Sequence, residues 1–269
     1  MRGVFSAGVL DVFLERQFDP FDLAVGVSAG ACNLASHVAG QYGRNRRCYF
    51  DLMTSRRFIN RRRFLRGQSI LDLDWLWDQL AAREPLRVDV IAKRPVEFIV
   101  VATSRDTGKA VYLRPGPADM LESLKASSAL PVLYRRHLTV CGESLVDGGV
   151  ADPIPVEEAY RCGARRIMVL RTRPSTAVKT DGMSERVMAW LLRREPALAA
   201  AVRSTAAAYQ RAVAFLDAPP ADCEIVQVAP PAPLATTRTS QDRAALEHDY
   251  ALGRALGEEA IRRWKRGRE

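Results

Sequence analysis

The stretch Phe21–Asn33 reads FDLAVGVSAGACN and contains the clearest strand-to-helix transition in the chain. Asp22–Val27 is a short apolar run that predicts a buried strand, and the residues after it predict a helix through about His37. The sequence Gly26–Gly30 between them has the pattern G-x-S-x-G. Its small residues would let the strand and the helix approach closely, with the hydroxyl of Ser28 exposed on a sharp turn at the helix N-terminus.

As a bare string this motif is weak evidence. Glycine makes up about 7% of average sequence, so chance places such a pattern in roughly a tenth of chains of this length. A glycine-rich turn without chemistry is therefore a plain alternative. The strand before the motif and the helix after it are the context that the motif requires, and they favour a nucleophilic serine.

The rest of the chain alternates between apolar runs and amphipathic segments. Further strands are expected at Val96–Thr103, Ala110–Leu113, Leu138–Val146 with a turn at Gly142, Arg166–Arg171 and Glu224–Val228. Further helices are expected at Val4–Arg16, Leu71–Ala82, Met120–Ser128, Pro155–Cys162, Ser184–Arg194, Pro196–Phe215 and Asp242–Lys265. This order predicts an α/β fold whose mostly parallel sheet is covered on both faces. We expect one domain over residues 1–269, with a motif-bearing core of about 1–175 and C-terminal elements over about 176–269.

The composition is that of a globular protein with a substantial core. Of 269 residues, 48% are hydrophobic and 26% are charged, which excludes intrinsic disorder and a collagen-like or disulfide-stapled fold. The formal net charge of +9 favours anionic partners such as lipid headgroups or nucleic acid. Five scattered cysteines without a C-x-x-C pair indicate reduced thiols and a cytoplasmic protein. No apolar run approaches the roughly 18 residues that a membrane-spanning helix needs.

A carboxylate that could activate the serine lies in Leu145–Gly149, which reads LVDGG. Asp147 follows a predicted strand and precedes Gly148, so its side chain is expected at the carboxyl edge of the sheet, where α/β folds bind ligands. A turn aspartate that bonds only its own backbone is the alternative.

The three histidines are poorly placed to act as the base. His37 lies in the predicted helix after Ser28, His137 lies in a polar run, and His248 lies in the terminal helix. A surface or structural role is the simpler interpretation for each. A triad of Ser28, Asp147 and His248 nevertheless stays open, because hydrolases with this order of residues exist.

Four segments together resemble the patatin-like phospholipase family, lipid acyl hydrolases that use a serine–aspartate dyad without histidine. The segments stand in the family's order and roughly its spacing, over about the first 160 residues. They are Met1-Arg2-Gly3 with the VFSAGVLDVFLE that follows, FDLAVGVSAGACN around Ser28, ASSALP at Ala126–Pro131, and LVDGGVADPIP at Leu145–Pro155.

The resemblance implies a three-layer αβα fold and a hydrolase of lipid or other acyl esters without cofactor or metal. Ser28 would be the nucleophile that forms an acyl-enzyme, and Asp147 would be the base. Backbone N–H groups would hold the oxyanion. The candidate oxyanion and binding residues are Arg2, Gly3 and Ala29.

The chain departs from the family at its start. Family members begin with a strand and a G-G-G-x-R-G loop, of which this chain retains only Arg2 and Gly3. We expect the missing strand to leave an exposed sheet edge and an unfilled groove. Two interpretations stay open: Met1 is an internal methionine of a longer protein, which we favour, or the chain is a truncated member with impaired catalysis. The second would make it a lipid- or protein-binding module.

A basic stretch follows the helix after Ser28. Nine arginines lie in Arg44–Arg66, interleaved with aromatic residues at Tyr49, Phe50, Phe58 and Phe64. We predict a rim near the pocket at which arginines meet lipid phosphates while the aromatics enter the interface, so that the protein binds anionic membranes peripherally. A solvated charged surface is the alternative. Nucleic acid is not expected, because no recognised binding module accompanies the stretch.

Overall fold

The computed structural model describes residues 1–176 and 183–266. Its strands are β1 (Leu23–Val27), β2 (Glu97–Ser104), β3 (Ala110–Leu113), β4 (Leu138–Val140), β5 (Glu143–Asp147), β6 (Arg166–Leu170) and β7 (Glu224–Val228). Its α-helices are α1 (Val4–Glu15), α2 (Ala29–Val38), α3 (Arg44–Arg47), α4 (Leu73–Arg83), α5 (Val88–Ile91), α6 (Met120–Ser127), α7 (Val156–Arg161), α8 (Met183–Leu191), α9 (Pro196–Asp217) and α10 (Arg243–Arg266). Short π-helical or 3₁₀ turns occur at Cys48–Met53, Arg61–Arg66 and Gly148–Val150.

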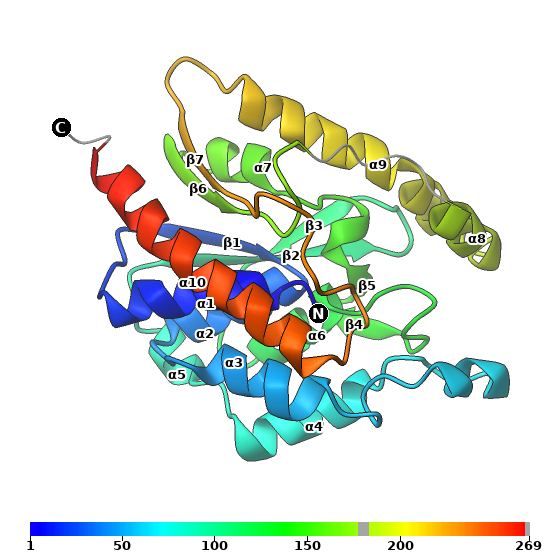
Figure 1. The fold of residues 1–269 in the computed structure, drawn as a ribbon. Coiled ribbons are helices and arrows are strands. Elements are labelled where there is room, and N and C mark those ends of the chain that lie inside the picture. Colours follow the sequence, from blue (N-terminus) through cyan, green and yellow to red (C-terminus); the bar gives the residue numbers. More distant parts are fainter. Residues whose placement is uncertain (177–182, 267–269) are drawn as a thin grey trace.

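The strands form a middle layer with helices on both faces (Figure 1). Successive side chains of a strand point to opposite faces, and β1 follows this rule. Ala24 packs in a cluster with α2, α5 and α6, whereas Leu23 and Val25 pack in a cluster with α7 and α9. The predicted three-layer αβα fold is confirmed.

The central sheet is mixed, so the expectation of a mostly parallel sheet is wrong. The strand order is β1-β2-β5-β4, with β3 also paired to β2. Only β1 and β2 run parallel in it, and the β2–β3, β2–β5 and β4–β5 pairs are antiparallel. The physical reason is the length of the connections: short turns join β2 to β3 and β4 to β5, and a parallel pair needs a longer crossover.

The edge of β1 opposite β2 has no strand partner among the described residues. The nearby strands β6 and β7 form a separate parallel pair. Residues of both β1 and β6 line one cavity of about 550 Å³. The predicted groove is therefore present, and the edge of β1 is unpaired among the described residues, although no residue of β1 is exposed.

Helices α1 and α10 lie at opposite ends of the sequence but pack against one another in the structure. Nearly all of α1 is buried, and Phe5, Val9 and Phe13 form a cluster with Ile261 and Trp264 of α10. The helix that follows Met1 is therefore an interior element, and its burial explains its apolar sequence.

Candidate active site

Ser28 stands alone between the end of β1 and the start of α2. Its backbone has φ 54° and ψ −129°. Residues other than glycine rarely adopt this conformation, which marks local strain. A Cβ on Gly26 would lie only 2.4 Å from the Cα of Ala31. Glycine at position 26 is thus what allows α2 to cross so close to β1, and the sharp turn exposes the hydroxyl of Ser28. Gly30, the other glycine of the motif, has open space around it.

The structure brings Ser28 and Asp147 into direct contact. Ser28 Oγ donates a hydrogen bond of 2.6 Å to Asp147 Oδ2. The second oxygen, Oδ1, accepts the N–H of Gly149 at 2.8 Å. Both carboxylate oxygens are therefore held, and one of them points at the serine. The two residues are far apart in the sequence but meet in space because β1 and β5 flank β2 and run in opposite directions, so that their ends lie level with one another, Val27 beside Val101 and Asp147 beside Ala102.

The environment of Asp147 favours a stronger base than an exposed aspartate. Its side chain is buried, and burial raises the pKa of the carboxyl above its usual value. The hydrogen bonds from Ser28 and Gly149 and the charge of Arg238 oppose this effect. The raised pKa means that Asp147 binds a proton more tightly than an exposed aspartate does, as a general base that works near neutral pH requires.

A second layer of hydrogen bonds fixes the turn. The N–H of Ser28 donates to Ser127 Oγ at 2.8 Å, and that hydroxyl donates to the carbonyl of Val101 at 2.6 Å. Thr103 Oγ1 donates to the carbonyl of Asp147 at 2.9 Å. The roles of Ser127 and Thr103 escape a sequence argument, although the ASSALP segment that contains Ser127 was part of the resemblance.

Gly148 has a packing role next to the acid. A Cβ at this position would lie 2.1 Å from the carbonyl oxygen of Val101 on β2. Only glycine lets the chain after β5 pass so close to the neighbouring strand. The glycine after Asp147 therefore helps to hold the carboxylate close to β2, where Asp147 pairs with Ala102.

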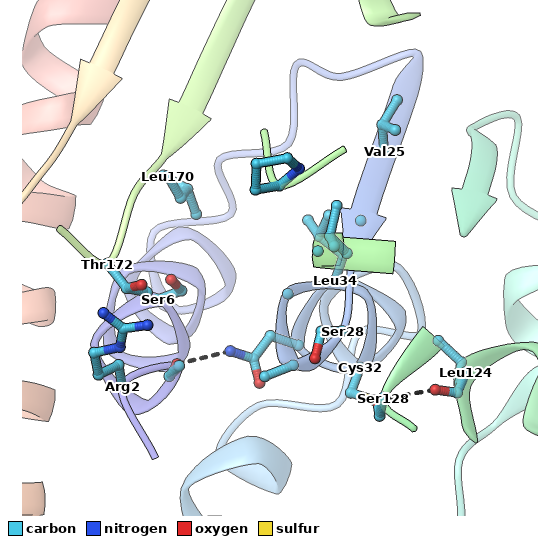
Figure 2. A pocket seen from close by; sticks show the side chains of 18 of the residues that line it. Arg2, Ser6, Val25, Ser28, Cys32, Leu34, Leu124, Ser128, Leu170 and Thr172 are labelled. Carbon is cyan, nitrogen blue, oxygen red and sulfur yellow. Dashed lines mark hydrogen bonds between the residues drawn. The ribbon is translucent and has the colours of Figure 1, made fainter. Parts of the chain in front are cut away.

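Of the three predicted oxyanion residues, Gly3 lies close to Ala29, the residue after Ser28, and Arg2 lines the cavity that contains Ser28. A Cβ on Gly3 would come within 3.0 Å of the Cβ of Ala29, and the carbonyl of Gly3 accepts a 2.8 Å hydrogen bond from Asn33 Nδ2. Ala29 is the first residue of α2, so its N–H has no acceptor within the helix. Arg2 lines the same cavity as Ser28 (Figure 2).

The cavity beside Ser28 is mostly apolar, with cations on its wall. Its apolar lining includes Leu10, Phe13, Leu34, Met168 and Leu170, and Figure 2 shows Leu34 and Leu170 near the serine.

Arg2, Arg173 and Arg238 also line the cavity, and within residues 1–176 and 183–266 none of them forms an ion pair. Burial and the two neighbouring arginines lower the pKa of Arg2 to about 10. Their mutual repulsion makes this wall favourable for an anion.

No histidine contacts the dyad in the described part of the chain. His248 pairs with its neighbour Asp249 at 3.1 Å and is largely exposed. The buried His37 lies 3.5 Å from Asp19. His137 is exposed. The geometry therefore offers Asp147, and none of the histidines, as the partner of Ser28.

Part of the prediction for Arg44–Arg66 is wrong. Tyr49, Phe50 and Phe58 are at most 3% exposed and belong to the core, so they do not enter an interface. The side chain of Phe64 lies outside the described residues.

Several of the arginines have protein partners. Arg44 is buried and donates to Ser36 Oγ at 2.8 Å and to the carbonyl of Glu84 at 2.9 Å. Other arginines of the stretch pair with Glu247, Glu84 and Asp72. Much of this basic segment is therefore structural.

Two features are absent from the described part of the chain. No three His, Cys, Asp or Glu side chains come close enough to hold a metal ion within residues 1–176 and 183–266. None of the helices over the same ranges combines the length and the apolar character that a bilayer span requires.

Comparison with known proteins gives two family matches and several relatives. Residues 1–160 match the family described as patatin-like phospholipase, and residues 195–267 match a domain of unknown function, DUF6363. An uncharacterized Escherichia coli protein, YjjU, is 37% identical over 261 residues, which are 95% of this chain and 73% of that protein.

Uncharacterized NTE family proteins of Mycobacterium tuberculosis (Rv1063c) and Mycobacterium bovis (Mb1092c) are 30% identical over 217 residues, or 77% of this chain. The match spans about half, 54%, of each mycobacterial protein.

Proposed function

This chain belongs to the patatin-like phospholipase family, and on that premise we propose that it is a serine hydrolase that cleaves carboxylic esters of lipids. The observation that carries the proposal is the 2.6 Å hydrogen bond from Ser28 Oγ to Asp147 Oδ2 on a strained strand-to-helix turn. A nucleophile within hydrogen-bond reach of a held base is the arrangement that covalent catalysis needs.

The first half of the reaction acylates the enzyme. Ser28 Oγ attacks the ester carbonyl while its proton passes to Asp147 Oδ2. The negative charge that develops on the carbonyl oxygen is held by the N–H groups of Gly3 and Ala29, and such donors typically contribute about 3–4 kcal/mol each. When the intermediate collapses, the protonated Asp147 gives its proton to the leaving alcohol, and the acyl group stays on Ser28.

The second half releases the acid. Asp147 takes a proton from a water molecule as that water attacks the acyl-enzyme carbonyl. The second tetrahedral intermediate then expels Ser28, which recovers its proton from Asp147, and the carboxylic acid leaves. One carboxylate thus serves as base and acid in both halves.

The cavity supports a lipid as the source of the ester. Its apolar walls suit an acyl chain, and the arginines at positions 2, 173 and 238 suit an anionic group on the substrate or the carboxylate product. We place the protein in the cytoplasm, in contact with membranes through its substrate; the five cysteines, all free thiols, support that compartment.

Turnover of p-nitrophenyl butyrate tests the proposal. The wild-type chain should hydrolyse the ester, Ser28→Ala should abolish turnover, and Asp147→Asn should reduce it at least about 10³-fold, because the base is lost. His248→Ala is the matched control and should keep wild-type turnover. Loss of turnover in the histidine variant would point to a triad. A folded wild-type protein that binds lipid without hydrolysing any ester would support the binding-module alternative.

A further inference from the structure

Helix α8 is apolar on two opposite faces. On its inner face, Ala189 is 2% exposed, and together with the next residue, Leu192, it packs against Leu198 and Val202 of α9. On its outer face, four large apolar side chains are open to solvent. They are Met183 at 72%, Val187 at 49%, Trp190 at 62% and Leu191 at 37% exposure.

The four exposed side chains form one stripe. Positions 183, 187, 190 and 191 have the i, i+4, i+7, i+8 spacing of a single helix face. Among the described residues, the other large apolar side chains that are exposed are the isolated Tyr42 and Leu121. An apolar helix face normally packs against another apolar surface, so the outer face of α8 calls for a partner.

Positive charges border this stripe. At about 100° per residue, Arg186 falls along one edge of it, and Arg193 lies in the turn just after the helix; both arginines are exposed. The guanidinium of Arg193 lies 4.6 Å from the centre of the Trp190 ring. Of the nearby acids, Glu185 lines the internal cavity, and Glu195 is paired with Arg105. The outer face therefore combines apolar side chains with two arginines that form no ion pair within residues 1–176 and 183–266, the pattern of helices that lie in a lipid interface.

The position of α8 connects this face to the candidate active site. Figure 1 shows α8 at the periphery of the molecule beside the start of α9. Its residues Glu185 and Met188 line the cavity that also contains Ser28. One helix thus has solvent on its outer side and the cavity on its inner side.

We propose that the outer face of α8 binds the surface of an anionic lipid bilayer. Trp190, Val187 and Met183 enter the region between headgroups and acyl chains, and Arg186 and Arg193 contact lipid phosphates. This surface takes the place of Tyr49, Phe50 and Phe58 of the Arg44–Arg66 stretch, which are buried. The benefit for catalysis, delivery of lipid esters to the cavity, rests on the proposed function, whereas binding to the bilayer does not.

Sedimentation with vesicles tests the proposal on the full chain. Wild-type protein should bind phosphatidylcholine vesicles that contain 30% phosphatidylglycerol and bind pure phosphatidylcholine more weakly, with the difference reduced at high salt. The variant Val187→Ser/Trp190→Ser should lower the partition coefficient about tenfold or more. Tyr42→Ser, which removes an equally exposed aromatic ring elsewhere, should leave it unchanged.

Two further measurements separate the outcomes. Brominated lipids should quench the fluorescence of the wild-type protein, and the quenching should be lost in Trp190→Phe. Turnover of soluble p-nitrophenyl butyrate should be the same in wild-type protein and in Val187→Ser/Trp190→Ser, so that an inactive enzyme and a wrong membrane surface are distinguishable. The proposal is overturned if the vesicles bind both proteins equally or neither, or if the α8 variant abolishes only self-association, which would assign the stripe to a second copy of the chain.

Discussion

Gly26→Ala tests whether the turn that carries the nucleophile depends on close contact between β1 and α2. The new Cβ would lie 2.4 Å from the Cα of Ala31 and 2.9 Å from its amide nitrogen, whereas carbon atoms in contact normally lie about 3.5–4.0 Å apart. Both atoms belong to the backbone, so no change of rotamer relieves the clash, and α2 must shift by about 1 Å. Overpacking of this kind costs about 1–3 kcal/mol and sometimes more, and we expect a value near 3 kcal/mol.

Gly30→Ala is the matched control in the same motif. A Cβ there meets no atom within 4 Å. Position 30 lies in the first turn of α2, and alanine is up to about 1 kcal/mol better than glycine in a helix. The same substitution, four residues further along the chain, should therefore stabilise the protein by about 0.5 kcal/mol.

Thermal unfolding followed by circular dichroism measures both effects. A chain of this size changes its Tm by about 2 °C for each kcal/mol. Gly26→Ala should lower the Tm by about 6 °C and reduce esterase turnover, and Gly30→Ala should raise the Tm by about 1 °C. The reasoning is refuted if the two variants shift the Tm equally, or if Gly26→Ala keeps both the Tm and the turnover of the wild type.

Three further predictions follow from the surroundings of the dyad and from the basic stretch. Because burial raises the pKa of Asp147, kcat/KM should increase with pH, and the midpoint of that increase should lie above the ordinary aspartate pKa of about 3.9. Arg238 lowers the pKa of Asp147, so Arg238→Gln should move this midpoint to higher pH. A midpoint that is unchanged or lower in Arg238→Gln contradicts this prediction. Ser127→Ala leaves the N–H of Ser28 without its acceptor and should cost about 1–3 kcal/mol in urea unfolding. Its control Ser123→Ala, which removes a buried hydroxyl that lacks a partner among the described residues, should cost much less; equal losses would count against the role given to Ser127. Arg44→Ala should destabilise the protein by about 2–3 kcal/mol, because the arginine is buried and hydrogen-bonded; a change below about 0.5 kcal/mol would return it to the class of surface charges.

The residues of the dyad could be predicted from the sequence because their chemistry demands a local context. A serine between a strand and a helix, flanked by glycines, indicates the turn, and an aspartate before two glycines indicates a strand end. The expected position of Asp147 at the carboxyl edge of the sheet is wrong, because β5 runs antiparallel to β2. The contact between Ser28 and Asp147 at 2.6 Å depends on strand order, which periodicity cannot supply. The family resemblance closed that gap for Ser28 and Asp147.

Other features depend on contacts between distant residues and escaped prediction. The sequence predicts strands at Ala110–Leu113 and on both sides of Gly142. It does not predict that the antiparallel pairs that these strands form make the central sheet mixed. Phe50 and Phe58 lie among arginines in the sequence. Both are nevertheless buried, because they pack in one cluster with residues of α1, α4 and α10. Conversely, the sequence predicts a helix at Ser184–Arg194 but does not indicate that its outer face exposes Trp190.

Covalent labelling with a fluorophosphonate probe, followed by mass spectrometry of the peptides, tests the central claim most directly. We predict one adduct per chain, located on Ser28, with a labelling rate that falls sharply in Asp147→Asn and is unchanged in His248→Ala. An adduct on any other residue, or a labelling rate at Ser28 that does not depend on Asp147, would contradict the account.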